Sequence, residues 1–399
     1  MERYDYIIAG AGAAGLNMAY HLLQAGLLDQ QSLLLIDQAP KTANDRTWCF
    51  WEVGDNVFEP IVFRRWRQVA FHGEGFSRAL DLSPYCYKMI RGEDFYRFMD
   101  QALAARSSIA RRYGRVERIA EDETGAQVVV DGKAYRGAWV FNSIAAASPR
   151  PTPVAAADGV YHTLLQHFAG WVVSTPAPIF DPSAATLMDF RIPQRGECRF
   201  CYVLPFDAQR ALVEFTVFSP RLLARDAYDR EIEAYLRDFL GAARYEIEHE
   251  EFGVIPMTDA PFQTFPGRRV VNIGIAGGCA KPSTGYTFLR IQQQAQRITH
   301  ALKTTGQPRY TVSPFQRRFG LYDSVLLNIL DKQRYPGRNV FTDLFARNPI
   351  ARVLKFLDET TSLIEDAGVL TSTWFPPFVA ATLDVTLGRL WRRLRAPAS

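Results

Sequence analysis

The sequence lacks the features that mark several classes of protein. Its net charge is only +4 over 399 residues and its basic residues are mostly scattered, so the composition does not indicate nucleic-acid binding. It contains neither internal repeats nor low-complexity tracts. The five cysteines are an odd number and no cleavable leader precedes the first predicted strand, which together favour a reducing compartment, the cytoplasm by default.

A metal site is not predicted. Cys198 and Cys201 form a CxxC pair, but the sequence supplies no second pair and no histidine cluster to complete a set of ligands. We therefore interpret the CxxC spacing as incidental.

A long unbroken hydrophobic run is also missing. The uncharged segment 367–383 is interrupted by Pro376-Pro377, so it is too short and too broken for a transmembrane helix. Large apolar residues and arginines follow it: Leu390, Trp391, Arg389, Arg392, Arg393 and Arg395. This composition is typical of a monotopic contact with an anionic membrane surface; the alternative is a C-terminal helix docked on the core.

The first 37 residues have the pattern of a βαβ unit. Residues 4–9 form a short apolar strand, a helical pattern follows, and residues 32–36 form a second buried strand that ends at Asp37. A carboxylate at the end of this second strand is placed to accept hydrogen bonds from an adenosine ribose. The unit therefore predicts a dinucleotide-binding domain.

Gly10, Gly12 and Gly15 form a GxGxxG motif between that first strand and the helix. Glycines at this spacing permit a tight turn and let a pyrophosphate reach the N–H groups at the start of the helix. Two loop arginines are candidates for the same pyrophosphate, although each is equally well explained as a surface or structural residue: Arg46 and Arg91.

A late strand favours FAD over NAD as the dinucleotide. Residues 271–275 form a buried strand before a Gly-rich turn, hundreds of residues after the glycine motif, as in a discontinuous FAD domain. Thr284 and Gly285 precede a helix and are predicted to offer backbone N–H groups to the flavin pyrimidine oxygens. The alternative is a helix cap formed by Ser283 or Thr284.

The predicted fold class is α/β, with a discontinuous Rossmann-type FAD-binding domain, a sheet-built substrate domain and a helical C-terminal region. The FAD-binding domain takes residues 1–150 and 266–315, and the substrate domain takes residues 151–265. Residues 316–399 form the helical region, which carries the candidate membrane contact. Within the first part, residues 44–51 are predicted as a loop and residues 89–104 as a helix.

One carboxylate stands in an otherwise apolar predicted strand, residues 211–219 (ALVEFTVFS). Strand alternation gives Glu214 buried surroundings, and burial keeps an unpaired carboxyl group protonated. A protonated Glu214 that faces an apolar ligand is a proton donor. The alternatives are a glutamate on a sheet edge, or one paired with Arg191 or Arg199.

Seven segments carry a resemblance to one family. They are NDRTWCFW at 44–51, MIRGEDFY at 89–96, YVLPF at 202–206, LVEFT at 212–216, GVIPM at 253–257, KPSTGYTF at 281–288 and VLKFLDE at 353–359. In this order and at these separations they resemble the FAD-dependent lycopene β-cyclases of bacteria and plants. The LVEFT and PSTGY segments are specific to that family rather than to flavoproteins at large.

The resemblance implies a lycopene β-cyclase of carotenoid biosynthesis, in which a proton starts a redox-neutral cyclisation of the ψ ends of lycopene to β-ionone rings. Glu214 matches the essential acid of the family, in a segment that often holds two adjacent carboxylates; here Phe215 takes the second position. Reduced FAD would stabilise the carbocation, and NAD(P)H is the expected electron donor. Asn142 and Ser143 stand where many relatives in the wider superfamily carry an acidic residue and an arginine.

A membrane-borne acyclic carotenoid as substrate implies a protein that is cytoplasmic and peripherally associated with the inner membrane. Two other functions fit the same scaffold: a flavin monooxygenase or prenyl/carotenoid reductase, and a non-catalytic carotenoid-binding or membrane scaffold protein. Product mass separates the enzymes, because cyclisation leaves the mass of the polyene unchanged.

Overall fold

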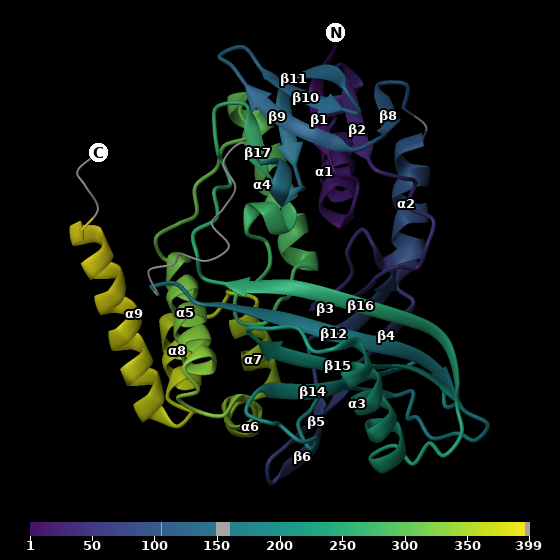
Figure 1. The fold of residues 1–399 in the computed structure, drawn as a ribbon, viewed down its shortest axis with the longest axis vertical. Coiled ribbons are helices and arrows are strands. Elements are labelled where there is room, and N and C mark those ends of the chain that lie inside the picture. Colours follow the sequence, from purple (N-terminus) through teal and green to yellow (C-terminus); the bar gives the residue numbers. More distant parts are fainter. Residues whose placement is uncertain (105, 149–159, 396–399) are drawn as a thin grey trace.

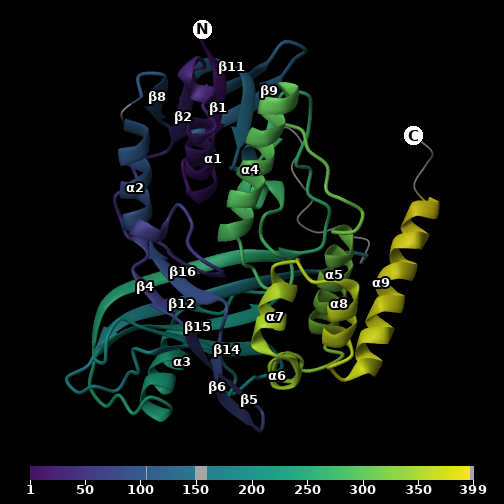
Figure 2. The same cartoon turned by 180° about the vertical axis from the view of Figure 1, so that it is seen from behind.

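The computed structural model describes residues 1–104, 106–148 and 160–395, which form two large sheets, a small sheet and a set of C-terminal helices (Figure 1). The α/β fold with a helical C-terminal region confirms the predicted class. The first large sheet and its helices lie at one end of the molecule, and the second sheet lies at the other (Figure 2).

The first sheet has seven strands in the order β8-β2-β1-β11-β10-β9, with β17 beside β11. Its strands are β1 (Glu2–Ala9), β2 (Leu33–Asp37), β8 (Ile109–Tyr113), β9 (Val116–Glu121), β10 (Ala126–Val130), β11 (Lys133–Asn142) and β17 (Val270–Asn272). Helices α1 (Ala13–Gln24), α2 (Gly92–Ala104) and α4 (Phe288–Thr305) accompany it. Because β17 pairs in parallel with β11, this sheet is assembled from two distant stretches of sequence.

The second sheet has the strand order β16-β12-β15-β14-β13-β5-β6. Its strands are β5 (Gln68–Gly73), β6 (Phe76–Asp81), β12 (Thr163–Ser174), β13 (Ala184–Asp189), β14 (Cys198–Pro205), β15 (Arg210–Ser219) and β16 (Glu246–Thr258). One face packs against α3 (Arg225–Asp238) and the other against the C-terminal helices. Strands β5 and β6 come from the first 150 residues, so this stretch contributes to both large sheets.

The two cysteines of the CxxC pair lie on opposite faces of the second sheet. Cys198 belongs to the core on the side of the C-terminal helices, whereas Cys201 belongs to the core beneath α3. Residues three apart on a strand point to opposite faces, so the two thiols do not face each other. All five cysteines are free, and the described residues contain no cluster of metal-ligating side chains.

The small sheet corrects two predictions. Residues 44–51, predicted as a loop, overlap with strand β3 (Thr47–Glu52), which pairs with β7 (Cys86–Arg91). Strand β7 also pairs with β4 (Arg64–Trp66). The helix predicted from residue 89 begins only at Gly92, because residues 86–91 pair as a strand. The aromatic and β-branched residues of both segments suit a strand, and pairing between distant segments decides the outcome.

The C-terminal region is helical, as predicted. It contains α5 (Arg317–Asp331), α6 (Gly337–Arg347), α7 (Ile350–Leu357), α8 (Leu363–Leu370) and α9 (Phe375–Arg395). Pro376 and Pro377 lie in the first turn of α9, where a proline is tolerated because the N–H it lacks has no partner within the helix. Among the helices of the described residues, none combines the length and the hydropathy that a membrane crossing requires.

Candidate active site

A cavity of about 450 Å³ is lined by residues from the dinucleotide-type unit and from the second sheet. At one end lie Gly12 and Ala13 at the start of α1; at the other lies Glu214 on β15. The sequence separates these residues by about half of the chain, and the fold brings them to one space.

The glycine motif has the close packing that its spacing predicts. A Cβ atom on Gly15 would stand 1.8 Å from the carbonyl oxygen of Gly10, so only glycine lets α1 approach the end of β1 this closely. Gly12, at the N-cap of α1, has no other atom within 4 Å of the position a Cβ would take. The start of α1 therefore presents uncapped N–H groups to open space, as pyrophosphate binding requires.

Asp37 lies beside the glycine motif at the end of β2. Its carboxylate accepts hydrogen bonds from the backbone N–H of Ala11 at 2.7 Å and of Gln38 at 2.7 Å, and Lys41 lies 3.4 Å away. Asp37 also lines a small hollow that opens next to Ala11. It is thus held in place by the turn itself, with carboxylate lone pairs left for a ribose.

The two candidate arginines are placed differently. Arg46 lines the cavity and donates to the carbonyl oxygen of Phe252 at 3.2 Å. Arg91 is not among the lining residues; it pairs with Glu93 at 3.1 Å and Asp94 at 2.7 Å. Arg46 is therefore the arginine that this geometry offers to a ligand.

Thr284 and Gly285 both line the cavity, but their N–H groups are already engaged. Both N–H groups donate to the carbonyl oxygen of Lys281, at 3.2 Å and 2.8 Å. The helix begins later, at Phe288 with Thr287 as its N-cap, so neither Ser283 nor Thr284 caps it.

Unpartnered polar atoms around Thr284 indicate that this part of the cavity suits a polar ligand. The Thr284 hydroxyl and the Gln166 side-chain oxygen are buried and have no hydrogen-bond partner in the described part of the chain. Thr287 and Phe288, at the uncapped start of α4, line the cavity beside them. A flat heteroaromatic ring with hydrogen-bonding edges, such as an isoalloxazine, fits these residues.

Glu214 lies on an interior strand of the second sheet, between β12 and β14, and so is not an edge residue. The two arginines considered as partners bind other acids: Arg191 pairs with Asp189, and Arg199 with Glu197 and Glu231. Desolvation raises the pKa of the Glu214 carboxyl well above its usual range. The raised pKa favours the protonated form of Glu214, which is half-buried on the cavity wall.

A second carboxyl group lies beside that of Glu214, and the sequence gives no signal for it. Glu251 on β16 is 8% exposed, and its carboxyl group is in hydrogen-bond contact with that of Glu214. Thr216 donates to Glu214 at 2.6 Å and Thr47 donates to Glu251 at 2.9 Å. Burial is the main cause that raises both pKa values, and the charge of Glu251 raises that of Glu214 further.

Gly170 makes this contact possible. It lies on β12, directly between Glu214 on β15 and Glu251 on β16. A Cβ atom on Gly170 would stand 3.1 Å from Cγ and 3.3 Å from Oε1 of Glu251, so the bare backbone leaves the room in which Glu251 lies. Phe215 is buried on the opposite face beneath α3, so a carboxylate at that position would not meet Glu214.

The rest of the cavity wall is rich in aromatic rings. They are Trp48, Tyr87, Tyr96, Phe168, Tyr202, Tyr286 and Phe288. Burial raises the pKa values of the Tyr202 and Tyr286 hydroxyl groups, so both rings stay neutral. Neutral aromatic faces in a site screened from water attract a cation.

Comparison with solved structures finds proteins of the same fold. A geranylgeranyl bacteriochlorophyll reductase-like protein of Thermoplasma acidophilum superposes with a TM-score of 0.60 at 13% identity, covering 96% of each chain. HpxO of Klebsiella pneumoniae, solved in complex with FAD, gives a TM-score of 0.56 at 16% identity, covering 97% of this chain and 99% of its own. At these identities the likeness concerns the fold.

Comparison of sequences identifies the family. Lycopene β-cyclase of Pseudescherichia vulneris is 25% identical over 97% of this chain and 96% of its own, and that of Pantoea ananas is 25% identical over 79% of each. The family described as lycopene cyclase protein matches residues 5–383. The chain therefore belongs to the lycopene cyclase family.

Proposed function

We propose that the protein is an FAD-dependent lycopene β-cyclase, which forms β-ionone rings from the ψ ends of lycopene without net redox change. The observation that carries the proposal is Glu214, a carboxyl group whose pKa is raised by burial and by the neighbouring Glu251, on the wall of an aromatic cavity that the start of α1 also lines. Family membership and this one cavity support the same chemistry.

The reaction needs a proton at the terminal double bond of the polyene. Protonated Glu214 donates it and becomes a carboxylate, while the neighbouring alkene captures the new cation and closes the ring. The aromatic wall stabilises the positive charge until a proton leaves the ring. That proton goes back to the carboxylate pair, so the protein returns to its starting state with one proton on the pair.

FAD fits the residues at the other end of the cavity. The start of α1 would hold the pyrophosphate, Asp37 the ribose, and the Thr284 and Gln166 side chains the edge of the ring system. When bound in its reduced form, FAD supplies negative charge that stabilises a nearby cation. The proposal includes NAD(P)H as the source of the electrons that keep it reduced.

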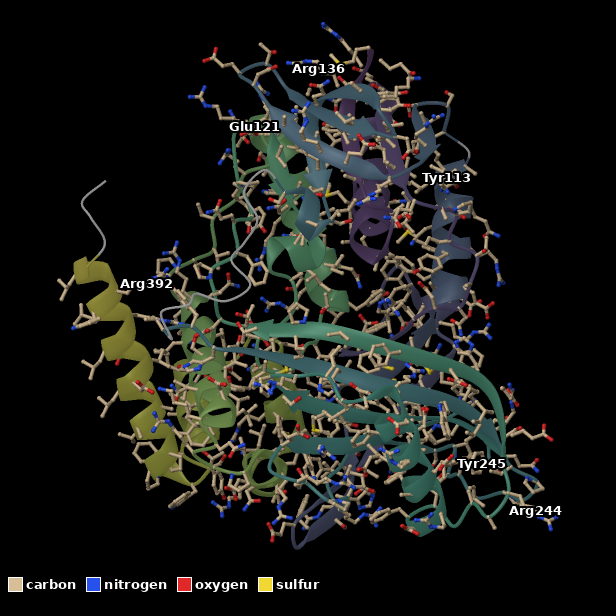
Figure 3. The ribbon with its side chains drawn as sticks, in the orientation of Figure 1. Tyr113, Glu121, Arg136, Arg244, Tyr245 and Arg392 are labelled. Atoms are coloured by element: carbon tan, nitrogen blue, oxygen red, sulfur yellow. The ribbon has the colours of Figure 1, made fainter. Side chains whose placement is uncertain are left out.

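A membrane contact belongs to the same proposal. Phe375, Val379, Leu383, Leu387 and Trp391 follow one another at intervals of four residues on α9, and all are exposed. Residues four apart lie on one face of a helix, so α9 carries an outward apolar stripe. Figure 3 places Arg392 near the C-terminal end of that helix. An apolar stripe that ends in basic residues suits the interface of an anionic bilayer.

The test is expression in cells that accumulate lycopene, with the pigments separated by chromatography and identified by mass. We expect ring-containing carotenes of unchanged mass from the wild type. Glu214→Gln should retain FAD and lower ring formation by about 10²-fold to 10⁴-fold, the usual contribution of a general acid. Products heavier by oxygen or hydrogen would instead identify a monooxygenase or a reductase.

A further inference from the structure

A second cavity lies among the C-terminal helices, outside the site described above. It measures about 370 Å³ and is bordered mainly by apolar side chains of α5, α6, α8 and α9. Leu326, Phe341 and Leu344 belong to its inner wall. The one carboxylate on its wall, Asp323, is neutralised by Lys281 at 2.9 Å. Such a wall suits a hydrocarbon and offers little to a polar ligand.

The cavity reaches the surface along α9. Phe375, Val379 and Leu383 line it, yet these three residues are 55%, 38% and 55% exposed. They are the first three members of the outward apolar stripe on α9. One row of side chains thus borders both the cavity and the surface that we assign to the membrane.

The inner end of the cavity lies next to the active site. Thr284 lines both cavities, so the two adjoin at the turn that carries Ser283 and Thr284. The turn at Thr284 therefore lies between the active-site cavity, whose wall carries Glu214, and the apolar cavity beside the membrane-facing helix.

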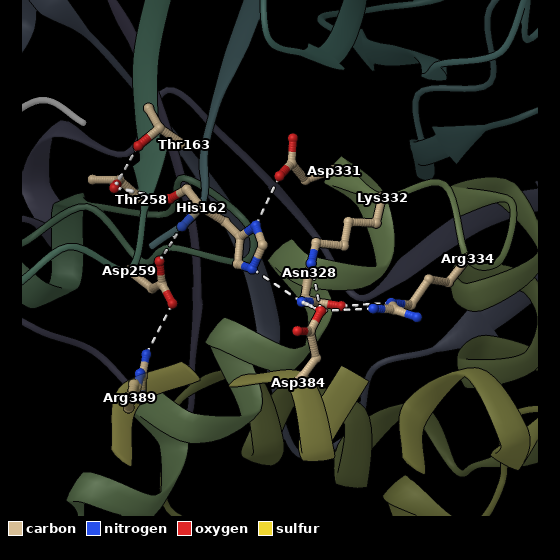
Figure 4. A network of polar contacts seen from close by, with 10 residues as sticks. All are labelled: His162, Thr163, Thr258, Asp259, Asn328, Asp331, Lys332, Arg334, Asp384 and Arg389. Carbon is tan, nitrogen blue, oxygen red and sulfur yellow. Dashed lines mark hydrogen bonds and ion pairs between the residues drawn. The ribbon is translucent and has the colours of Figure 1, made fainter. Parts of the chain in front are cut away.

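Polar contacts hold α9 along one edge (Figure 4). Asp384 accepts from Asn328 at 2.9 Å and pairs with Arg334 at 2.6 Å. Arg389 pairs with Asp259 at 2.8 Å, at the end of β16. These ion pairs hold α9 in place on one side. The position of the helix therefore does not depend on core side chains that would fill the cavity.

We infer that this cavity holds the hydrocarbon chain of the substrate behind the end that is being cyclised, and that Phe375, Val379 and Leu383 form its entrance from the bilayer. The inference rests on the proposed function, which requires a polyene end at Glu214. A long polyene extends beyond the 450 Å³ active-site cavity. The remainder of its chain needs apolar surroundings, because each CH₂ group left in water costs about 0.8 kcal/mol.

The test uses the purified FAD-loaded protein and cis-parinaric acid, a fluorescent conjugated polyene chain. Val379→Trp narrows the entrance, while Leu387→Trp adds the same side chain two turns further along the stripe, where Leu387 does not line the cavity. We expect saturable binding to the wild type, at least tenfold weaker binding to Val379→Trp, and unchanged binding to Leu387→Trp. Lycopene in detergent should displace the probe, whereas dioleoyl phosphatidylcholine should not.

Equal binding by Val379→Trp and the wild type, or displacement by the phospholipid alone, would overturn the inference. If Val379→Trp does not fold, Val379→Cys provides the same test: bound lycopene should slow its reaction with N-ethylmaleimide and leave that of Leu387→Cys unchanged. Equal rates with and without lycopene would also overturn the inference. Polyene binding of the expected kind without any ring formation would contradict the proposed function and leave the cavity assignment intact.

Discussion

Glu214 and Glu251 touch across Gly170, which lies opposite each of them on the strand between. A glycine at that position lets two carboxyl groups from different strands come together, and burial raises the pKa of both. Two carboxyl groups this close do not both ionise, so the pair keeps one neutral member for proton donation. The second carboxyl group beside Glu214 thus comes from β16 and not from position 215, whose side chain lies on the opposite face of the sheet.

Replacement of Glu251 by glutamine should move the pH profile of ring formation. The rate falls as pH rises through the pKa of Glu214, because only the protonated form donates. The charge of Glu251 raises that pKa, so Glu251→Gln should shift the alkaline limb to lower pH by about one unit or more. The measurement is the initial rate with lycopene in vesicles from pH 5 to 9.

The neighbouring carboxylate provides the matched control for this shift. Glu250 lies on the same strand with a side chain that is 56% exposed, and Glu250→Gln should leave the profile in place. Other ionisable groups face the pair from adjoining elements: Cys49, Tyr202, Tyr286, His249 and Arg46. These groups are identical in both variants and contribute equally to the two pH profiles. A uniform loss of rate in Glu251→Gln, with no shift of its pH profile, would show that Glu251 acts only on the fold.

Replacement of Gly12 by valine should weaken FAD binding without unfolding the protein. No other atom lies within 4 Å of the position of its Cβ, and its φ of −77° suits any residue, so the added side chain points only into the space for the pyrophosphate. We expect the FAD content after purification to fall at least about tenfold while the Tm of the apoprotein is unchanged. Gly320→Ala, at another open position, is the control for FAD content. Full FAD occupancy in Gly12→Val would place the pyrophosphate elsewhere.

Asp358 should make the protein less stable as pH rises. Burial raises its pKa from 3.8 to about 7, so the folded state holds this proton more tightly than the unfolded chain does. The group therefore stabilises the fold fully below about pH 4, and this stabilisation is lost as pH rises to 7. Each pKa unit is worth about 1.4 kcal/mol, so the loss is at most about 4 kcal/mol.

Urea unfolding at pH 5 and pH 8 tests this expectation. Asp358→Asn should reduce the difference in the free energy of unfolding between the two pH values. Asp226→Asn, whose side chain is 67% exposed, should not. An unchanged pH dependence in Asp358→Asn would show that Asp358 ionises normally in the folded protein.

Acidic residues at two exposed leucine positions of α9 should release the protein from membranes. Leu387 and Leu394 are 60% and 75% exposed, so Leu387→Glu/Leu394→Glu changes the surface without disturbing the core. Sedimentation with phosphatidylglycerol vesicles should show at least about tenfold weaker binding, because two apolar contacts are lost and two negative charges are added. Leu222→Glu, 49% exposed and next to α3, serves as the control. Equal vesicle binding by the double variant and this control would exclude α9 as the contact.

Much of the fold follows from local sequence patterns. The glycine motif, the flanking strands and Asp37 are close in the chain, so their geometry is set by short-range backbone constraints that a single sequence displays. The alternation in residues 211–219 likewise placed Glu214 on a strand with both faces buried. Strand β16 escaped prediction because its first half, with glutamates around His249, resembles a solvated segment.

The sequence by itself determined the dinucleotide-type turn, the class of fold and the place of Glu214 on a strand, because each depends on neighbours a few residues away. Only the tertiary structure decided that Glu251 is the partner of that acid, that Arg46 and not Arg91 borders the cavity, and that α9 borders a second apolar space. These relations depend on which distant strands and helices pack together. Long-range pairing in a sheet is fixed by the burial of whole faces, and one sequence gives no direct signal for it.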